Sequence, residues 1–317
     1  MSNLTLPEYE DIRTAYKRIK SYIHRTPVLT CQALNRMCQA EIYFKCENYQ
    51  KTGAFKIRGA TNAVMSLEDQ EVQYGIATHS SGNHAAALAQ AAKWRGIKSF
   101  VVMPENTSRI KIEAVRGYGA EISFCKPSLK AREEGLNEVV RDTGAVFIHP
   151  YNDARIIAGQ GTAALELTEE VPDLDAVLAP VGGGGLLSGT SIVVSHMIPG
   201  ACIYGIEPEN ADDARRSFHS GKLIPVKNPD TIADGLRTSL GNLTFALIKN
   251  YVTDIISVRE QKIIFAMRHI WERMKIVVEP SAAVPVAALI SRRSEISGRR
   301  IGVILSGGNV DLKSLPF

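Results

Sequence analysis

Cysteine is scarce in this sequence of 317 residues, and no two cysteines have the C-x-x-C spacing. The five are Cys31, Cys38, Cys46, Cys125 and Cys202. Their odd number and scattered positions argue against both a disulfide framework and a structural zinc site. A strong charge bias is also lacking, because the formal net charge is +4 and no basic block alternates with aromatic residues. Nucleic-acid binding is therefore not expected.

Long apolar segments are absent as well. The first ten residues are polar and the longest apolar runs are short, so we expect neither a signal peptide nor a membrane span. The expected location is cytoplasmic. A chain of this length buries about three quarters of its unfolded surface and lies where one core commonly divides into two.

Short apolar runs alternate with helical patterns, which predicts an α/β fold with parallel sheets. Predicted strands and helices of a first series lie at residues 75–77, 85–94, 99–103, 107–116, 122–125, 128–141 and 146–148. A second series lies at residues 163–170, 176–181, 186–195, 202–206, 255–258, 282–290 and 301–305. No change in composition separates the two series.

One lysine stands where an apolar strand leads into a helix. Lys56 lies between a strand predicted at 42–46 and a helix predicted at 60–67, and Phe55 and Ile57 flank it. Desolvation favours an uncharged amine, which is the state that a Schiff-base lysine needs. The alternative is an ordinary lysine that extends its amine to solvent, and the lysine alone does not decide between the two.

A run of four glycines follows a predicted strand and opens a predicted helix: Gly182, Gly183, Gly184 and Gly185. Backbone without side chains can approach an anion closely, and free N–H groups at a helix start bind phosphate. The run is neither a dinucleotide fingerprint, because residue 187 is leucine, nor a P-loop, because no Gly-Lys-Ser/Thr follows. A phosphate on a non-nucleotide cofactor fits better than a flexible hinge.

Other polar residues stand at predicted strand and helix ends. Asn83 follows the loop 80–82, where its amide can bond a ligand or cap a helix. His84 is more often structural, and Arg132 lies in a charge-rich run typical of a solvated face. Ser306 ends the last predicted strand, and ligands of α/β sheets lie beyond the carboxyl ends of strands.

Taken together, the lysine stretch 51–59, the loop 79–84 and the four glycines resemble the fold type II enzymes that use pyridoxal 5'-phosphate. The resemblance runs from about Tyr9 to the C-terminus and is strongest to the serine racemase, serine/threonine dehydratase and 3-hydroxyaspartate dehydratase branch. It includes the landmarks Glu207-Pro208, Asp234-Gly235, Glu279-Pro280 and Ser306-Gly307-Gly308-Asn309.

The resemblance implies a fold like that of the tryptophan synthase β chain. Two three-layer domains, each with a parallel sheet, would hold the active site between them. The small domain would comprise residues 51–149, and the large domain residues 1–50 and 150–317.

The resemblance also implies roles for individual residues. Lys56 would hold the cofactor as a Schiff base and remove the α-proton of the substrate. The other cofactor residues would be Phe55, Asn83, Gly182, Gly183, Gly184, Gly185, Leu186, Gly235 and Ser306. The substrate would contact Ser80, Ser81, Asn83, His84 and Arg132.

Two serines bear on the type of reaction. The resemblance places the Ser306 hydroxyl on the pyridine nitrogen, and a neutral hydroxyl does not force that nitrogen to be protonated. The ring is then a weaker electron sink, which favours early loss of a β-leaving group. Ser81 stands where dehydratases that do not racemise commonly have alanine. It would exchange protons on the α-carbon face opposite Lys56, although serine in a turn often only bonds backbone.

A cation site is a further expectation. Glu207 and Asp213 flank a short acidic stretch, and from the spacing alone an acid-rich helix start is the favoured interpretation. The resemblance instead implies Mg²⁺ or Ca²⁺ bound by Glu207, the Ala211 carbonyl and Asp213. It also implies a homodimer. Ala86 replaces a glutamine of the ATP site in related enzymes, so regulation by ATP is doubtful.

We therefore expect a pyridoxal-phosphate-dependent ammonia-lyase that converts L-serine, L-threonine or 3-hydroxyaspartate to a keto acid and ammonia, with serine racemase activity. Serine racemisation as the main activity is the close alternative. An inactive cofactor-binding regulatory protein is a second alternative, against which the intact Lys56, Ser81 and Ser306 argue. A sulfhydrylase-type replacement enzyme is disfavoured by the Ser-Ser-Gly-Asn-His loop.

Overall fold

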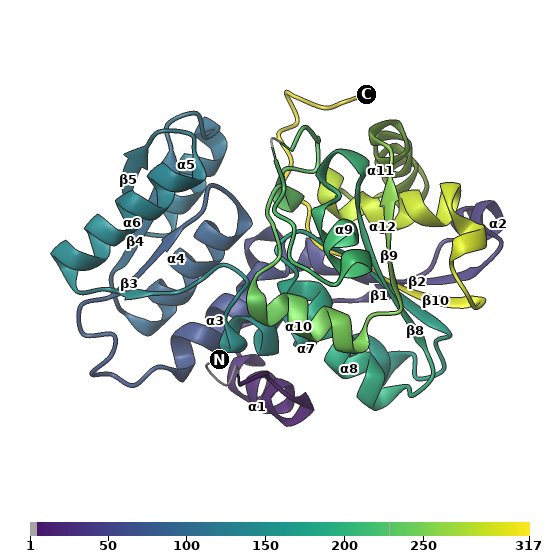
Figure 1. The fold of residues 1–317 in the computed structure, drawn as a ribbon, viewed down its shortest axis with the longest axis horizontal. Coiled ribbons are helices and arrows are strands. Elements are labelled where there is room, and N and C mark those ends of the chain that lie inside the picture. The colour runs from purple at the N-terminus through teal and green to yellow at the C-terminus, as the bar shows by residue number, and fades with distance from the viewer. Residues whose placement is uncertain (1–4, 228) are drawn as a thin grey trace.

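The computed structural model describes residues 5–227 and 229–317, whose strands form two separate sheets (Figure 1). The larger sheet has six strands in the order β1-β2-β10-β7-β8-β9, and only the β1–β2 pair is antiparallel. These strands are β1 (Val28–Leu29), β2 (Glu41–Cys46), β7 (Ala176–Pro180), β8 (Cys202–Pro208), β9 (Asp254–Val258) and β10 (Arg300–Leu305).

Helices cover both faces of the six-stranded sheet. One apolar core joins it to α2 (Gln32–Cys38), α11 (Glu260–Met274) and α12 (Pro280–Ser291). A second core on the other face includes α1 (Tyr9–Ile19), α7 (Ala154–Glu170), α8 (Gly185–Met197) and α10 (Asn242–Tyr251). Helix α9 (Asp213–Ser220) follows β8 at one edge. The predicted three-layer arrangement is confirmed here, because successive strand residues point into different cores.

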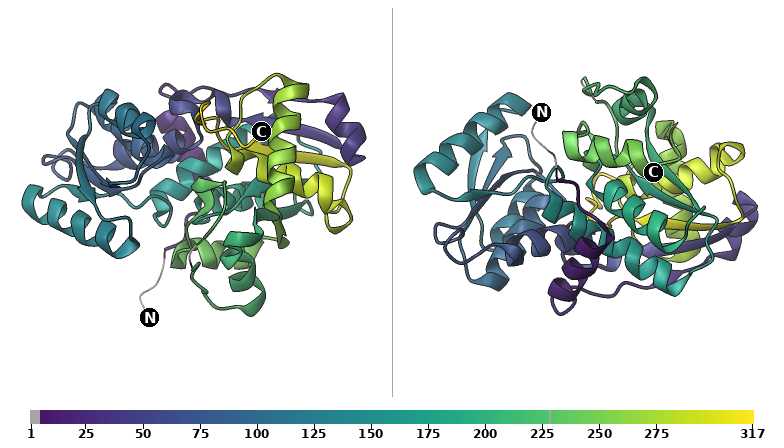
Figure 2. Two further views of the ribbon diagram at one scale, coloured as in Figure 1. Left: turned by 90° about the horizontal axis from the view of Figure 1, so that it is seen from above. Right: turned by 60° about the horizontal axis from the view of Figure 1, so that its bottom comes forward.

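The smaller sheet has four parallel strands in the order β5-β4-β3-β6. They are β3 (Ile76–His79), β4 (Ser99–Pro104), β5 (Glu121–Cys125) and β6 (Val146–Phe147). The helices of this part are α3 (Lys56–Ser66), α4 (Asn83–Arg95), α5 (Arg109–Gly117) and α6 (Leu129–Thr143). Figure 2 shows the two sheets in separate lobes from two further directions. The limits predicted at residues 51 and 149 remain a proposal.

Helix α3 packs on α4 of the small lobe and on α7 of the large one. A Cβ on Gly159 of α7 would lie 2.5 Å from the Cα of Gly59, so only glycine allows these two helices to approach so closely. Two predicted helix starts were too late: α3 begins at Lys56 and α7 begins at Ala154. Glycines at 59 and 159 weaken the helical pattern, which explains both differences.

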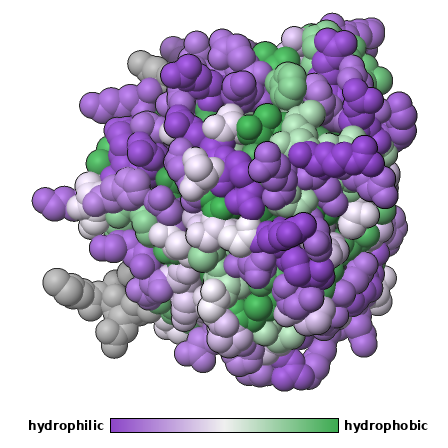
Figure 3. All heavy atoms as spheres, turned by 90° about the vertical axis from the view of Figure 1, so that its right-hand side faces the viewer, coloured by the Kyte–Doolittle hydropathy of each residue, from purple (hydrophilic) through white to green (hydrophobic). Residues whose placement is uncertain are grey.

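The surface of the large lobe is mostly polar. Figure 3 shows one face on which hydrophilic side chains predominate and apolar ones form smaller groups between them. No helix in the described residues has both the length and the apolar character needed to cross a membrane.

Candidate active site

The turn that carries Lys56 is fastened to the end of strand β10. The Phe55 N–H donates to the Ser306 carbonyl at 3.0 Å, and the Gly308 N–H donates to the Gly53 carbonyl at 2.9 Å. Ser306 is buried. Two motifs that are about 250 positions apart in the sequence are therefore held side by side by backbone hydrogen bonds.

The amine of Lys56 is half-buried and lies at the first turn of α3. Its Nζ donates to the Pro150 carbonyl at 2.9 Å and lies 5.3 Å from the centre of the Phe55 ring. Burial lowers the pKa of Lys56 to about 8, although the Glu279 carboxyl group opposes this shift. A lysine whose amine loses its proton this easily can act as a nucleophile and a base.

The chain segment that returns from the small lobe to the large one also faces this lysine. Nδ1 of His149 accepts the backbone N–H groups of Tyr151 at 3.3 Å and Asn152 at 2.9 Å. Asn152 in turn accepts the Leu243 N–H at 2.9 Å. None of these residues was predicted from the sequence to be part of the site. The polar run after strand β6 was the available signal, since ligands lie at the carboxyl ends of parallel strands.

The four glycines form a cradle beside this segment. A Cβ on Gly183 would lie 2.3 Å from the Tyr151 ring, and Gly184 has a φ of +88°, so side chains are excluded at both positions. Gly185 is the first residue of α8. The N–H groups of Gly185 and Leu186 precede the first hydrogen bond within this helix, so they are free to bind an anion.

Gly235 lies on the opposite side of the cradle. A Cβ on Gly182 would lie 3.1 Å from the Gly235 carbonyl oxygen, and the Gly235 N–H donates to Ser281 Oγ at 3.2 Å. The preceding Asp234 begins the short helix η4 (Asp234–Leu236) and pairs with Lys111 of α5. This ion pair connects the two lobes at the edge of the site.

The loop Ser80–His84 joins β3 to α4 and faces the large lobe. Asn83 is the first residue of α4, and its Nδ2 donates to Glu279 at 2.9 and 3.1 Å. Ser80 and Ser81 are half-buried. The structure thus brings this predicted loop to the Glu279-Pro280 landmark.

His84 is buried, and neither of its ring nitrogens has a hydrogen-bond partner within the described chain. The backbone of Ile148 lies near the ring but outside hydrogen-bonding geometry. Burial holds the pKa of His84 well below its usual range, and the charge of Lys56 adds to the effect. The ring is therefore neutral and has an unused donor and an unused acceptor.

Arg132 lies on α6 and is half-buried, not on a fully solvated face. Its Nε is buried and has no partner within the described residues, whereas Lys130 and Glu134 of the same helix form a surface pair. Burial, with the charge of Arg132, lowers the pKa of His79 to about 4. This guanidinium therefore lies beside the aromatic residues at the carboxyl ends of the small sheet, with its charge not balanced by a carboxylate.

Glu207 and Asp213 are both buried near the cradle, at the end of β8 and the start of α9. Glu207 accepts the Arg215 N–H at 2.7 Å and the Ala214 N–H at 3.3 Å, while Oδ2 of Asp213 is buried and has no partner in the part of the chain that the structure describes. Burial raises the pKa of Asp213 to about 7 and that of Glu207 well above its usual range. In the described residues no three His, Cys, Asp or Glu side chains cluster as a metal site, so the Ala211 carbonyl would be needed here.

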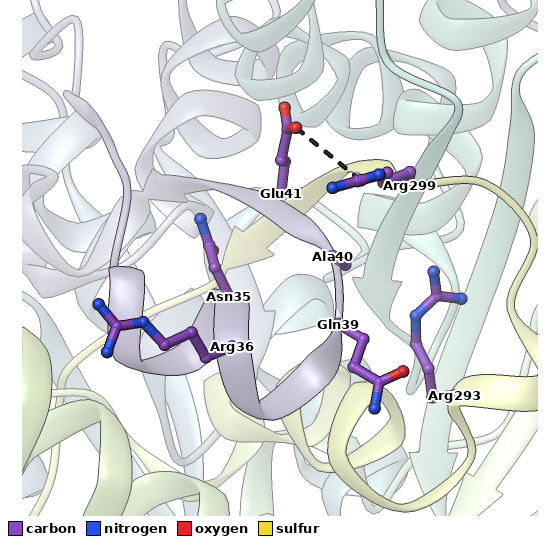
Figure 4. Close-up of a pocket in the computed structure, with 7 residues that line it drawn as sticks. All are labelled: Asn35, Arg36, Gln39, Ala40, Glu41, Arg293 and Arg299. Atoms are coloured by element: carbon purple, nitrogen blue, oxygen red, sulfur yellow. Dashed lines mark ion pairs between the residues drawn. The ribbon is translucent and has the colours of Figure 1, made fainter.

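A surface cavity lies away from this site, at the amino end of the six-stranded sheet. Arg293 donates to the backbone carbonyls of Cys38, Ile296 and Gly298, and Figure 4 shows Arg36 pointing away from Arg293 and Arg299. These arginines do not converge on one point, so we assign no site here. The cavity has a volume of about 580 Å³ and is lined by Asn35, Arg36, Gln39, Ala40, Glu41, Arg293 and Arg299.

Comparisons with known proteins agree with this geometry. Residues 19–307 match the family described as pyridoxal-phosphate dependent enzyme. The chain is 50% identical over 312 residues to beta-hydroxyaspartate dehydratase of Paracoccus denitrificans, covering 98% of this chain and 99% of the relative. It is 48% identical over 320 residues to serine racemase of Dictyostelium discoideum, with coverage of 99% and 98%. The structure of maize serine racemase superposes with a TM-score of 0.95 at 44% identity, covering 98% of this chain and 95% of that one.

Proposed function

Since the chain belongs to the family of pyridoxal-phosphate-dependent enzymes, we propose that it is an ammonia-lyase that dehydrates a β-hydroxy amino acid, preferably 3-hydroxyaspartate. The observation that carries the lyase assignment is the half-buried Lys56, whose pKa is lowered to about 8, between the Ser306 strand end and the Ser80–His84 loop. Relatives named beta-hydroxyaspartate dehydratase and L-threo-3-hydroxyaspartate ammonia-lyase support it. The products would be a keto acid and ammonia.

The residues present fit the cofactor. The cradle would hold its phosphate on the N–H groups of Gly185 and Leu186. A Cβ at Gly183 would collide with Tyr151, so no side chain covers the backbone of the cradle there. The Lys56 amine would bind the cofactor covalently, and Ser306 would offer its hydroxyl to the ring nitrogen. When bound, pyridoxal phosphate supplies an electron-withdrawing ring that makes the α-proton of an amino acid removable.

The chain's own groups bind and orient the substrate. The Ser80–His84 loop offers hydroxyls and the free N–H groups of the α4 start to the α-carboxylate. Lys56 is the base nearest to the reacting centre, and its low pKa allows it to accept a proton near neutral pH. The neutral His84 ring adds a donor without adding a charge.

Arg132 supports 3-hydroxyaspartate as the preferred substrate. Its guanidinium is half-buried, and its Nε has no hydrogen-bond partner among the described residues. A second substrate carboxylate would supply a partner, whereas serine and threonine have no such group. Arg132→Leu should lower kcat/KM for 3-hydroxyaspartate by about 100-fold and for serine by less than about fivefold. Arg141→Leu removes a surface arginine of the same helix and is the matched control. Equal losses on both substrates would refute this role.

Racemisation of serine is a second activity that Ser81 supports. Lys56 would serve only one face of the bound cofactor, so a proton delivered to the opposite face would need another group. Ser81→Ala should retain keto-acid release from the L-substrate and lose interconversion of D- and L-serine. Chiral chromatography beside a keto-acid assay measures both. Racemisation at the parent rate in the variant would remove Ser81 from the reaction.

The central assignment is tested by borohydride reduction of the yellow holoenzyme followed by peptide mapping. The label should be found on Lys56. A label on another lysine, or no label, would overturn the assignment. A yellow, labelled protein that releases no keto acid from any hydroxy amino acid would instead indicate a cofactor-binding regulatory protein.

We also propose that Mg²⁺ or Ca²⁺ binds Glu207, the Ala211 carbonyl and Asp213. Two buried carboxylates, one with an oxygen that has no hydrogen-bond partner among the described residues, support it, because oxygen ligands suit these ions. A homodimer, a cytoplasmic location and the lack of ATP regulation remain predictions from the sequence.

A further inference from the structure

Three landmarks of the sequence meet at one side of the site through side-chain amides. Asn83 Nδ2 donates to the Glu279 carboxylate at 2.9 and 3.1 Å. Asn309 Nδ2 donates to Asn83 Oδ1 at 2.9 Å and to the Thr52 carbonyl at 2.7 Å. The result is a chain of hydrogen bonds from the lysine turn, through two amides, to a buried carboxyl group.

The Thr52 end of this series of hydrogen bonds determines the orientation of both amides. The Thr52 carbonyl can only accept, so the NH₂ group of Asn309 must face it. The second N–H of that group reaches Asn83, which must therefore present its oxygen there. The Asn83 NH₂ group then faces Glu279. Both of its contacts go to the same carboxylate, so a single shared N–H can serve both oxygens and the second N–H is left for another acceptor.

We propose that Asn309 is a positioning residue that fixes the amide of Asn83 so that it donates its free N–H to the ring oxygen of the bound cofactor. The proposal rests on the proposed function, because it requires pyridoxal phosphate to be bound at Lys56 with its ring oxygen beside Asn83. A donor on this oxygen makes it less basic. The oxygen then competes less for the proton that it shares with the Lys56 nitrogen once lysine and cofactor are joined.

The lysine turn is shaped around Asn309. Thr52 has a φ of +61°, which is uncommon for a β-branched residue. In this conformation its carbonyl accepts a hydrogen bond from Asn309 Nδ2. A Cβ on Gly53 would lie 2.3 Å from Oδ1 of Asn309, so glycine is needed at this position. The backbone hydrogen bond between Gly308 and Gly53 holds the two segments in register. Asn309 therefore has little freedom to rotate its amide.

The test is a pH titration of the visible absorbance of the bound cofactor, which reports the proton at the Lys56 nitrogen without turnover. Asn309→Leu removes both donors and adds no charge. We expect the midpoint of the titration to rise by about one pH unit. Asn48→Leu is the matched control, because Asn48 bonds the Val277 carbonyl next to the same turn but does not contact Asn83. Its midpoint should equal that of the parent.

Asn309→Ser keeps one donor, so its midpoint should lie between those of the parent and Asn309→Leu. It also serves if Asn309→Leu folds poorly. A double-mutant cycle then separates positioning from general loosening of the turn. In an Asn83→Ala background, Asn309→Leu should cause no further shift.

An unchanged midpoint in Asn309→Leu, or a shift of full size in the Asn83→Ala background, would overturn the proposal. Failure of the proposed function would differ from either result, because the parent protein itself would then show no visible band with pyridoxal phosphate.

Discussion

Removing one charge from the buried cluster beneath helix α3 should destabilise the protein strongly. Lys45, Glu47, Arg58 and Glu166 are all fully buried, so two cations face two carboxylates without solvent. Arg58 pairs with Glu47 at 2.7 Å and with Glu166 at 2.8 Å, and Lys45 pairs with Glu166 at 2.7 Å. Burial disfavours the charged form of Arg58, but the two carboxylates have the larger effect and raise the pKa of Arg58.

Glu166→Gln retains the size of the side chain and leaves Lys45 and Arg58 with one carboxylate between them. Removing one partner from a buried ion pair costs about 3–5 kcal/mol, so we expect a loss of that size in the free energy of unfolding. The double variant Lys45→Met with Glu166→Gln restores the balance of one cation and one carboxylate. It should recover at least about half of the loss, because no uncompensated charge remains.

The assay is urea unfolding of the cofactor-free protein, since a bound ligand would add its own stabilisation. Trp94 on α4 and Trp271 on α11 report the small and the large lobe. Exposed Glu272→Gln, which breaks only a surface pair with Arg268, is the control and should leave the free energy of unfolding essentially unchanged. A loss below about 1 kcal/mol in Glu166→Gln would refute the reasoning. So would a double variant that is less stable than the single one, because charge balance would then not be the cause.

Three further outcomes follow from the site. Mg²⁺ should raise the melting temperature and chelation should lower it, and Glu207→Ala should remove this response; equal melting curves with and without chelator would contradict the cation site. Burial raises the pKa of Glu279 from 4.5 to about 7 in the folded protein, so the unfolded chain releases this proton at a lower pH. The free energy of unfolding of the cofactor-free protein should therefore fall by about 3 kcal/mol as the pH rises from 4.5 to 7. Urea unfolding across this range should show a flatter profile for Glu279→Gln, and an unchanged slope would exclude this carboxyl group as the cause. Lys111→Met should increase cofactor dissociation by up to about fivefold at low salt and by less in high salt, since its partner Asp234 is partly exposed; a salt-independent effect would exclude the ion pair.

The sequence was sufficient to predict the sheets and the residues at the ends of their strands. The order of strand and helix patterns implied parallel sheets, and parallel strands bring their carboxyl ends to one edge. This logic placed Ser306 and the four glycines each at the end of a strand, and the resemblance placed both at the cofactor. In the structure they follow the neighbouring strands β10 and β7 of the same sheet.

Other features depend on distant contacts that no local pattern contains. Arg58 finds Glu166 at a separation of 108 residues, and nothing near either residue indicates the pairing. The segment from His149 to Asn152 is another example. Its Pro150 carbonyl accepts the Lys56 amine across 94 positions of the sequence, a contact that no pattern near either residue indicates.

The first turn of α3 shows how one helix start can treat two cations in opposite ways. Lys56 and Arg58 are two residues apart; Lys56 is half-buried and Arg58 is fully buried. Lys56 faces a carbonyl and has no carboxylate in contact, so desolvation dominates and its pKa falls to about 8. Arg58 faces two carboxylates, so its charge is retained and it anchors the helix to the large lobe. A reactive amine must not be paired with a carboxylate, whereas the helix that carries it must be attached rigidly. The two side chains leave the helix in different directions, so both requirements are met.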